Sequence, residues 1–199
     1  MNLLKTLHYE LVFKRRVGVL AKHFSQLLPE NATVLDVGCG DGNISFQILQ
    51  LRPYISIQGI DILKREFTHI DVQLFDGKTI PFNDNRFDAV IFADVLHHMA
   101  DPTILIKEAK RVATSLVLIK DHCQEGAIDR HILKVMDWIG NAQYGVVLPY
   151  NYWNRQQWIT TFAHLGMCID TWVDRVGLYP FPANLIFDRH LHFVGSLKI

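Results

Sequence analysis

Apolar positions follow two different spacings along the chain, and the two spacings predict alternating strands and helices. Short apolar runs rich in β-branched residues are typical of strands buried on both faces. These runs occupy residues 33–37, 55–61, 72–77, 89–93 and 115–120. Between them, apolar residues recur every three or four positions, as in amphipathic helices. The helical segments are residues 3–28, 44–49, 104–112, 128–139 and 158–162. This alternation predicts an α/β fold with a parallel sheet.

The end of the chain breaks this alternation. Residues 190–197 alternate polar and apolar side chains, as expected of an antiparallel edge strand. A turn around residues 180–184 precedes them, and residues 168–176 form a further extended run. The segment 167–198 is therefore expected to form its own part at the end of the domain; the family resemblance given below implies that it is a closing hairpin.

The chain of 199 residues is long enough for one α/β domain and contains no repeat, low-complexity run or linker. Four parts of that domain are expected. They are an N-terminal helical cap (1–30), a ligand-binding core (33–123), an aromatic insertion that forms a lid (126–154) and the hairpin (167–198).

Charge and cysteine content restrict the partners and the compartment. The chain has 20 Lys and Arg residues and 20 Asp and Glu residues, and this balance argues against electrostatic binding of nucleic acid. Cys39, Cys123 and Cys168 lack paired spacing, so free thiols in a reducing compartment are expected. No leader-like or membrane-spanning apolar run is visible. We expect a cytoplasmic protein, and its oligomeric state stays open.

The stretch 33–43 carries the strongest candidate chemistry. A buried strand leads into Gly38, Gly40 and Gly42, and a helical pattern begins at Ile44. A strand, a glycine turn and a helix let the backbone pass close to a ligand, because a Cβ at the glycines would occupy the ligand's space. A dinucleotide-binding turn has the spacing G-x-G-x-x-G, but Asn43 stands where the third glycine would be.

Acidic residues lie around this turn and at the ends of later strands. Asp36 and Asp41 flank the glycines, while Asp61 and Asp76 close the next two strands. Carboxylates would repel a pyrophosphate but attract an ammonium or a sulfonium. Asp61 follows the turn by about 20 residues, where a βαβ unit places a carboxylate against ribose hydroxyls. The pattern predicts a site for a cationic nucleoside.

Five motifs in register resemble the class I S-adenosylmethionine-dependent methyltransferases. The similarity is to the small-molecule group with ubiquinone/menaquinone-type enzymes. The motifs are Val34–Gly42, Gly59–Asp61, Phe75–Gly77, Ile80–Phe82 and Phe87–Val90, followed by Ala93–His98. The resemblance implies a Rossmann-like, doubly wound mixed sheet of seven strands in the order 3-2-1-4-5-7-6. It also implies S-adenosyl-L-methionine as the cofactor.

The resemblance assigns cofactor-binding roles to strand-end residues. Gly38, Gly40 and Gly42 would hold the methionine and ribose side, with Asp36 near the amino group. Asp61 would bind the ribose hydroxyls, with Ile62 beside it. Asp76 and Gly77 would face the adenine, and Asp94 would lie beside the methionine moiety.

The remaining candidates concern the methyl acceptor. A base is needed only if the acceptor loses a proton, and the candidates at the ligand edge are His97, His98, Asp121 and His122. No residue is assigned to a metal. A closed, largely apolar pocket for a small aromatic or lipid-like acceptor is expected from rings with polar tips. Its candidate residues are His8, Tyr9, Trp138, Asn141, Tyr144, Tyr150, Asn151 and Tyr152.

Two other classes of function stay open. One is a nicotinamide-dependent oxidoreductase on a similar fold, which Asn43 and the acids at the turn disfavour. The other is a non-catalytic partner subunit that binds the cofactor, because cofactor motifs report binding rather than turnover. The strand that ends at Ala93 lacks the Asn-Pro-Pro-aromatic signature of enzymes that methylate amino groups of nucleic acids. A small-molecule acceptor and no nucleic acid are therefore expected.

Overall fold

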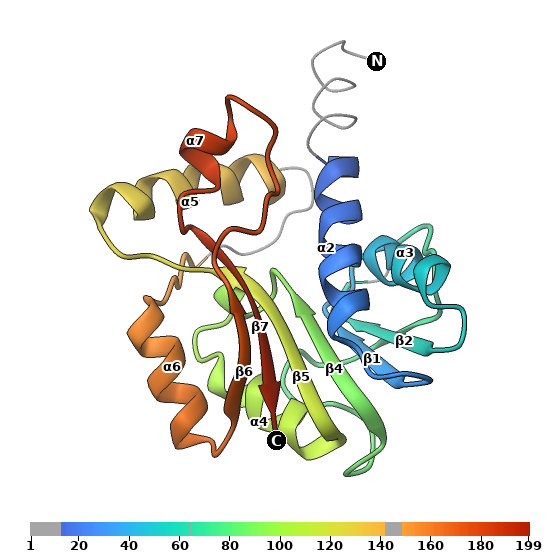
Figure 1. The fold of residues 1–199 in the computed structure, drawn as a ribbon. Coiled ribbons are helices and arrows are strands. Elements are labelled where there is room, and N and C mark those ends of the chain that lie inside the picture. The colour runs from blue at the N-terminus through green and yellow to red at the C-terminus, as the bar shows by residue number, and fades with distance from the viewer. Residues whose placement is uncertain (1–12, 64, 142–148) are drawn as a thin grey trace.

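The computed structural model describes residues 13–63, 65–141 and 149–199, with the side chains of 139–141 left aside. Within these residues, one seven-stranded sheet forms the centre of the molecule (Figure 1). The strands are β1 (Thr33–Val37), β2 (Ser56–Asp61), β3 (Val72–Leu74), β4 (Phe87–Ala93), β5 (Ala113–His122), β6 (Cys168–Val173) and β7 (His192–Lys198).

The strand order is β3-β2-β1-β4-β5-β7-β6, which confirms the predicted order. β1 to β5 pair in parallel, whereas β7 runs antiparallel to both β5 and β6. The expectation that residues 190–197 form an edge strand is wrong. β7 lies between β5 and β6 and is buried at all but its last residue, and the polar side chains His192 and Ser196 face the interior.

Helices cover both faces of the sheet (Figure 1). The helices are α2 (Lys14–Leu27), α3 (Asn43–Leu51), the 3-10 turn η2 (Leu96–His98), α4 (Thr103–Val112), α5 (Ala127–Asn141), α6 (Arg155–His164) and the short α7 (Asn184–Phe187). α2 and α3 lie on one face and α4 and α6 on the other, while α5 and α7 lie beyond the upper end of the sheet. No helix of the described residues is long and apolar enough to cross a membrane.

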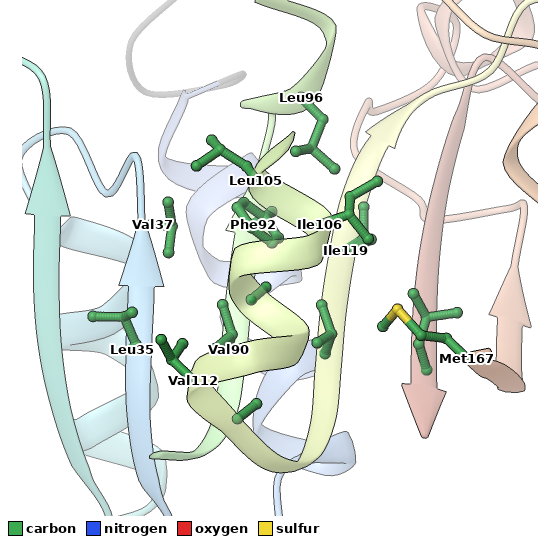
Figure 2. Close-up of a cluster of buried hydrophobic side chains, with 14 of the residues drawn as sticks. Leu35, Val37, Val90, Phe92, Leu96, Leu105, Ile106, Val112, Ile119 and Met167 are labelled. Atoms are coloured by element: carbon green, nitrogen blue, oxygen red, sulfur yellow. The ribbon is translucent and has the colours of Figure 1, made fainter. Parts of the chain in front are cut away.

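Two apolar clusters fix the sheet between these helices. The cluster in Figure 2 packs α4 and α6 against the sheet, and it includes Phe92, Ile106 and Trp158, all essentially buried. The opposite cluster packs α2 and α3 against the sheet through Phe24 and Ile48. With both faces buried, only the ends of the strands are left to carry polar side chains, which places the chemistry at the C-terminal edge.

The segment after β5 is anchored by local sequence signals. Asn154 caps α6, because its side chain accepts the N–H of Gln157 while the Gln157 side chain accepts the N–H of Asn154. The Trp158 indole donates to the carbonyl of His122, at 3.1 Å. These contacts hold the chain beside the end of β5.

Candidate functional site

The glycine turn between β1 and α3 has the conformation that the sequence predicts. Gly38, Gly40 and Gly42 have φ values of 71°, 61° and 74°, a region that disfavours side chains. A Cβ at Gly38 would collide with Val95 and one at Gly42 with Ile70, whereas one at Gly40 would meet no described atom within 4 Å. The expectation that all three glycines leave room for a ligand therefore holds only at Gly40, because packing already fills the space at the other two.

Asp36 lies at the end of β1 beside this turn and is 3% exposed. Its Oδ2 accepts the Ser45 hydroxyl at 2.6 Å, but its Oδ1 has no hydrogen-bond partner among the described residues. Burial raises the pKa of Asp36 to about 7, although the Ser45 hydrogen bond opposes the rise. A buried carboxylate oxygen without a partner is suited to a cationic ligand group.

Asp61 lies at the end of β2 and connects it to the glycine turn. Its Oδ2 accepts the N–H of Gly40 and its Oδ1 the N–H of Leu63, both at 2.8 Å. Each carboxylate oxygen retains a second lone pair, so hydroxyl groups of a ligand can still bind. The structure thus places the carboxylate against Gly40, the one glycine of this turn that faces open space.

The other residues predicted to bind the ribose and adenine side of the cofactor lie near Asp61. Ile62 is 57% exposed, and a Cβ at Gly77 would come within 3.0 Å of its Cγ2. The carboxylate of Asp76 accepts the N–H groups of Lys78 and Thr79, at 2.8 and 2.7 Å. These two bonds lower the pKa of Asp76, which keeps it ionised at neutral pH. The structure therefore brings Asp61, Ile62, Asp76 and Gly77 to one edge.

Asp94 follows β4 and has a positive φ of 60°. It pairs with the Arg16 guanidinium through Oδ2 and with the Lys120 ammonium through Oδ1. Burial raises the pKa of the Asp94 carboxyl, but the charges of Lys120 and Arg16 outweigh burial and hold this pKa well below its usual range. Asp94 thus joins α2, β4 and β5 at the ligand edge.

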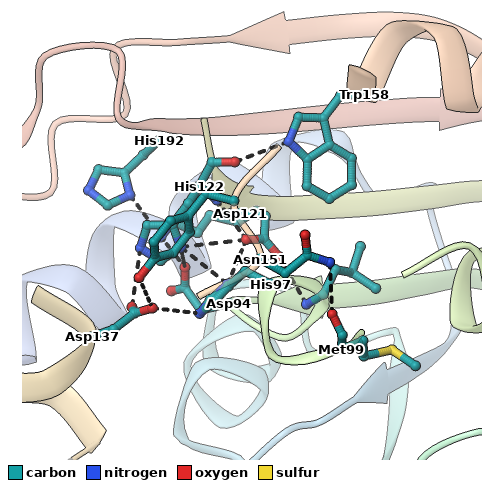
Figure 3. A network of polar contacts seen from close by, with 12 residues as sticks. Asp94, His97, Met99, Asp121, His122, Asp137, Asn151, Trp158 and His192 are labelled. Atoms are coloured by element: carbon teal, nitrogen blue, oxygen red, sulfur yellow. Dashed lines mark hydrogen bonds and ion pairs between the residues drawn. The ribbon is translucent and has the colours of Figure 1, made fainter. Parts of the chain in front are cut away.

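A buried cluster of imidazoles and carboxylates lies next to this ion pair, above the ends of β4 and β5 (Figure 3). The Nδ1 atom of His97 lies 2.6 Å from Oδ1 of Asp121 and 3.2 Å from Nδ1 of His122. Asp137 of α5 lies on the other side of both rings, 3.6 Å from Nε2 of His97 and 3.7 Å from Nε2 of His122. The Tyr152 hydroxyl donates to Asp137 at 2.5 Å.

Electrostatics differ among the histidines of this cluster. Burial lowers the pKa of His97, but the charge of Asp121 outweighs it and the net pKa is raised. Burial lowers the pKa of His98 to about 4, and the Nδ1 atom of His98 has no hydrogen-bond partner among the described residues. Burial and the nearby His97 also lower the pKa of His122. All four predicted catalytic candidates therefore meet at this place.

Only some of the residues predicted to line the acceptor pocket lie at the imidazole–carboxylate cluster. Tyr152 belongs to it, and the Asn151 amide donates to the carbonyls of Met99 and Ala100 at 2.9 and 3.2 Å. Tyr150 lies 6.3 Å from Tyr152 between ring centroids, whereas Trp138 is 62% exposed on α5. His8, Tyr9, Tyr144 and the Asn141 side chain lie outside the described part of the chain.

The surroundings of the cluster are polar in the described residues. Lys120, Asp121 and His122 extend β5 into this edge, while the largely apolar acceptor pocket, several of whose candidate residues lie outside the described part, stays a prediction. A cavity of about 460 Å³ lies elsewhere, beside α6 and the upper ends of β6 and β7, and Arg155 and Trp172 are among its lining residues. Of the predicted site residues, none lines this cavity.

Four further residues of the site belong to none of the sequence motifs, namely Arg16, Lys120, Asp137 and His192. Lys120 follows the buried apolar run 116–119 of β5 and is 1% exposed, and its ammonium lies 3.2 Å from Nδ1 of His192. Arg16 lies four residues before the buried Leu20 on the same helix. In both cases the sequence places a positively charged residue among apolar positions that are expected to be buried. Such a residue usually has an acidic partner, and this could have marked both as candidates.

The residues of the glycine turn fit S-adenosylmethionine. The partnerless Oδ1 of Asp36 suits the cofactor's ammonium, the open side of Gly40 allows close approach, and the Asp61 carboxylate retains lone pairs for ribose hydroxyls. Two cations, Arg16 and Lys120, lie near Asp94, where the carboxylate end of a methionine moiety would find positive charge.

Comparison with known proteins agrees with this fit. Residues 35–116 match a family model described as a methyltransferase domain. A tRNA U34 carboxymethyltransferase from Nautilia profundicola is 38% identical over 92 residues, which cover 41% of this chain and 30% of that protein. A 2-methyl-6-phytyl-1,4-hydroquinone methyltransferase from Synechocystis is 33% identical over 138 residues, which cover 64% and 38%. The chain thus spans about a third of the length of these relatives.

Solved structures resemble the whole fold at low sequence identity. A Haloferax volcanii putative methyltransferase, solved with a methyltransferase activator, has a TM-score of 0.69 at 15% identity, covering 98% of this chain and 92% of that one. A SAM-dependent methyltransferase from Aquifex aeolicus has a TM-score of 0.62 at 18% identity, covering 97% and 93%. These likenesses concern the fold. Residues 35–116 are thus similar to a methyltransferase domain, and the described residues share their fold with these methyltransferase structures.

Proposed function

We propose that this chain transfers the methyl group of S-adenosylmethionine to a small acceptor that has an aromatic or apolar body and a hydroxyl or amine group. The observation that supports this most directly is the position of the buried imidazole–carboxylate cluster. It lies at the C-terminal ends of β4 and β5, next to the strand edge that carries the glycine turn. An acceptor bound there would lie beside the cofactor.

The chain's own residues mainly hold and orient the reactants. Bound S-adenosylmethionine supplies a methyl group on a positively charged sulfur. The glycine turn, Asp36 and Asp61 would fix that cofactor, and the acceptor atom must lie in line with the methyl carbon at about 3–3.5 Å. The acceptor forms its bond to carbon while the carbon–sulfur bond breaks and its electron pair stays on sulfur. A hydroxyl or amine acceptor also loses a proton, for which His97, His98, Asp121 and His122 are the proposed recipients.

The size of the acceptor is proposed from charge and from the segment after β5. The equal numbers of basic and acidic residues give no excess positive charge for a nucleic-acid backbone. Asn151 ties the end of residues 126–154 to the turn after β4, and Tyr152 ties it to α5. We propose that this segment, with Trp138, Asn141, Tyr144 and Tyr150, is a lid over the acceptor, and that His8 and Tyr9 approach it from the N-terminal cap.

Isothermal calorimetry followed by a labelling assay tests this proposal. S-adenosylmethionine or its demethylated product should bind, whereas NAD should not. The protein is then incubated with S-adenosylmethionine labelled in the methyl group and with either a small-metabolite extract or total tRNA. Label should enter the small-metabolite fraction, and Asp61→Ala should reduce the transfer when the cofactor concentration is limiting.

Each failure has a distinct meaning. Tight binding of NAD without binding of either sulfur nucleoside would refute the methyltransferase assignment. Label in tRNA would leave the assignment intact and refute the small acceptor. Cofactor binding without transfer to either fraction would favour the non-catalytic partner subunit.

A further inference from the structure

We propose that a divalent transition-metal ion binds between the ends of β4 and β5. The four side chains that would hold it face one point, and their ligand atoms lie within 4.8 Å of one another. They are Asp94, His97, Asp121 and His122. Two ligands come from the turn after β4 and two from the end of β5, so no local spacing in the sequence indicates them (Figure 3).

The separations of the ligand atoms match those around a single ion. Two ligands of a tetrahedral zinc ion lie about 3.3 Å apart, given metal–nitrogen distances of about 2.0–2.1 Å. The Nδ1 atoms of His97 and His122 are 3.2 Å apart. Oδ1 of Asp121 lies 2.6 Å from the first and 3.5 Å from the second. Oδ1 of Asp94 lies 3.7 Å from Nδ1 of His122, so these four separations fall on both sides of the tetrahedral value.

The second ring nitrogens provide independent support. A histidine that binds a metal usually presents its other ring N–H to a carboxylate, which fixes the ring and its tautomer. The Nε2 atoms of both His97 and His122 point to Asp137, at 3.6 and 3.7 Å. The Tyr152 hydroxyl in turn donates to Asp137 at 2.5 Å. One carboxylate therefore lies near the second nitrogen of both rings, at ion-pair rather than hydrogen-bond distance, while the two Nδ1 atoms face each other at 3.2 Å.

The charge of the cluster also favours a cation. Arg16 and Lys120 both pair with Asp94, whereas the described ion-pair contacts of Asp121 are with the imidazoles of His97 and His122. A proton between these side chains can be shared by only two of the four ligand atoms. A metal ion can bind all four, so it would compensate the negative charge more completely. Two imidazoles with carboxylate oxygens suit Zn²⁺, Co²⁺, Fe²⁺ or Mn²⁺ better than Mg²⁺. Lys120 shares Oδ1 of Asp94, which makes Asp94 the weakest of the four ligands.

The role of the ion rests on the proposed methyl transfer. An ion at the ends of β4 and β5 would bind an acceptor oxygen and lower the pKa of its hydroxyl. The favoured acceptor class is then a phenol or another hydroxyl compound.

Cobalt titration of the metal-free protein tests the site without any cofactor, so its outcome is separate from that of methyl transfer. The protein is dialysed against a chelator and titrated with CoCl₂, and the visible absorption of bound Co²⁺ is followed. We expect saturation at one Co²⁺ per chain, displacement by Zn²⁺, and no displacement by equimolar Mg²⁺. His122→Ala and Asp121→Asn should each weaken binding at least 100-fold. Asp137→Asn, which only orients the rings, should weaken it about 10- to 100-fold.

His164→Ala is the matched control, because His164 is an exposed histidine on α6 outside the cluster and its loss should leave Co²⁺ binding unchanged. Circular dichroism establishes that each variant is folded. Should His122→Ala fail to fold, His122→Gln keeps the side-chain volume and a hydrogen-bonding group but lacks the imidazole. Absence of saturable Co²⁺ absorption in the wild-type protein would overturn the proposal. So would unchanged affinity in a folded His122 variant.

Discussion

The buried carboxyl of Asp36 should make cofactor binding depend on pH. Burial raises its pKa from the ordinary 3.8 to about 7. A difference of this size corresponds to about 4 kcal/mol of cost for the ionised form in the free protein. A cofactor ammonium placed at the partnerless Oδ1 would favour the ionised form and return the pKa toward its ordinary value.

The sign of the effect follows from which state holds the proton. Below about pH 7 the free protein holds a proton on Asp36, and the complex does not, so binding releases it. Affinity should rise about tenfold per pH unit up to about pH 7 and level off above it. At about pH 7 roughly half a proton should be released per bound cofactor.

Calorimetry with the demethylated cofactor measures both quantities. Titrations in buffers of different ionisation enthalpy, from about pH 5.5 to 8.5, give the number of protons released at each pH. Asp36→Asn should bind with a flat pH profile and release no proton from this site. A wild-type affinity that does not change with pH, or that falls as pH rises to 7, would refute the reasoning.

Free-protein stability gives a second measure of the same group. Because the pKa of Asp36 in the folded state exceeds its unfolded value, its stabilising contribution is complete below about pH 3.8 and is lost as pH rises through about 7. Above about pH 7, Asp36→Asn should therefore be more stable than the wild type, by up to about 4 kcal/mol in urea unfolding. A less stable variant at that pH would mean that the ionised carboxylate is stabilised by contacts other than the Ser45 hydroxyl.

Two further substitutions test the two halves of the site. Asp61→Ala should weaken cofactor binding by about 1.5–3 kcal/mol, the usual loss of hydrogen bonds to a charged group, with the fold retained by circular dichroism. The exposed Asp76→Ala is its comparison and should lose less, and equal losses in calorimetry would argue against the ribose role of Asp61. Tyr152→Phe removes the donor to the buried Asp137 and should lower stability by about 1–3 kcal/mol in urea unfolding. Unchanged stability would show that Asp137 does not depend on this bond.

The sequence was sufficient for the sheet and for the placement of most candidate residues at its C-terminal edge. Strand order followed from the family resemblance that five motifs carry, and Asp36, Asp61 and Asp94 lie at strand ends as predicted. The cause is physical: in a parallel sheet buried on both faces, polar residues are confined to the strand ends. A residue's position along its strand is then enough to place it.

Contacts between distant elements were beyond the reach of sequence patterns. Arg16 and Asp94 are 78 residues apart, and their pairing depends on how α2 packs across β4. The alternation at His192 and Ser196 resembled an edge strand, because a strand with one polar face looks the same whether that face meets water or a buried charged cluster. Asp137 was missed for a similar reason, since only the course of α5 above the sheet brings it to the histidines.

The packing around Gly38 and Gly42 limits what the glycine motif can reveal about related chains. A side chain at either position would displace Val95 or Ile70, so selection for a stable fold alone would keep both glycines. A descendant that had stopped using the cofactor would still carry them, together with the match to the family. Gly40 is different, because the space beside it is open in the described structure and its φ of 61° is one that Asn or Asp can also adopt, so a bound molecule is the stronger demand for glycine there. In related chains, loss of the middle glycine would therefore be the earlier sign of an abandoned cofactor site.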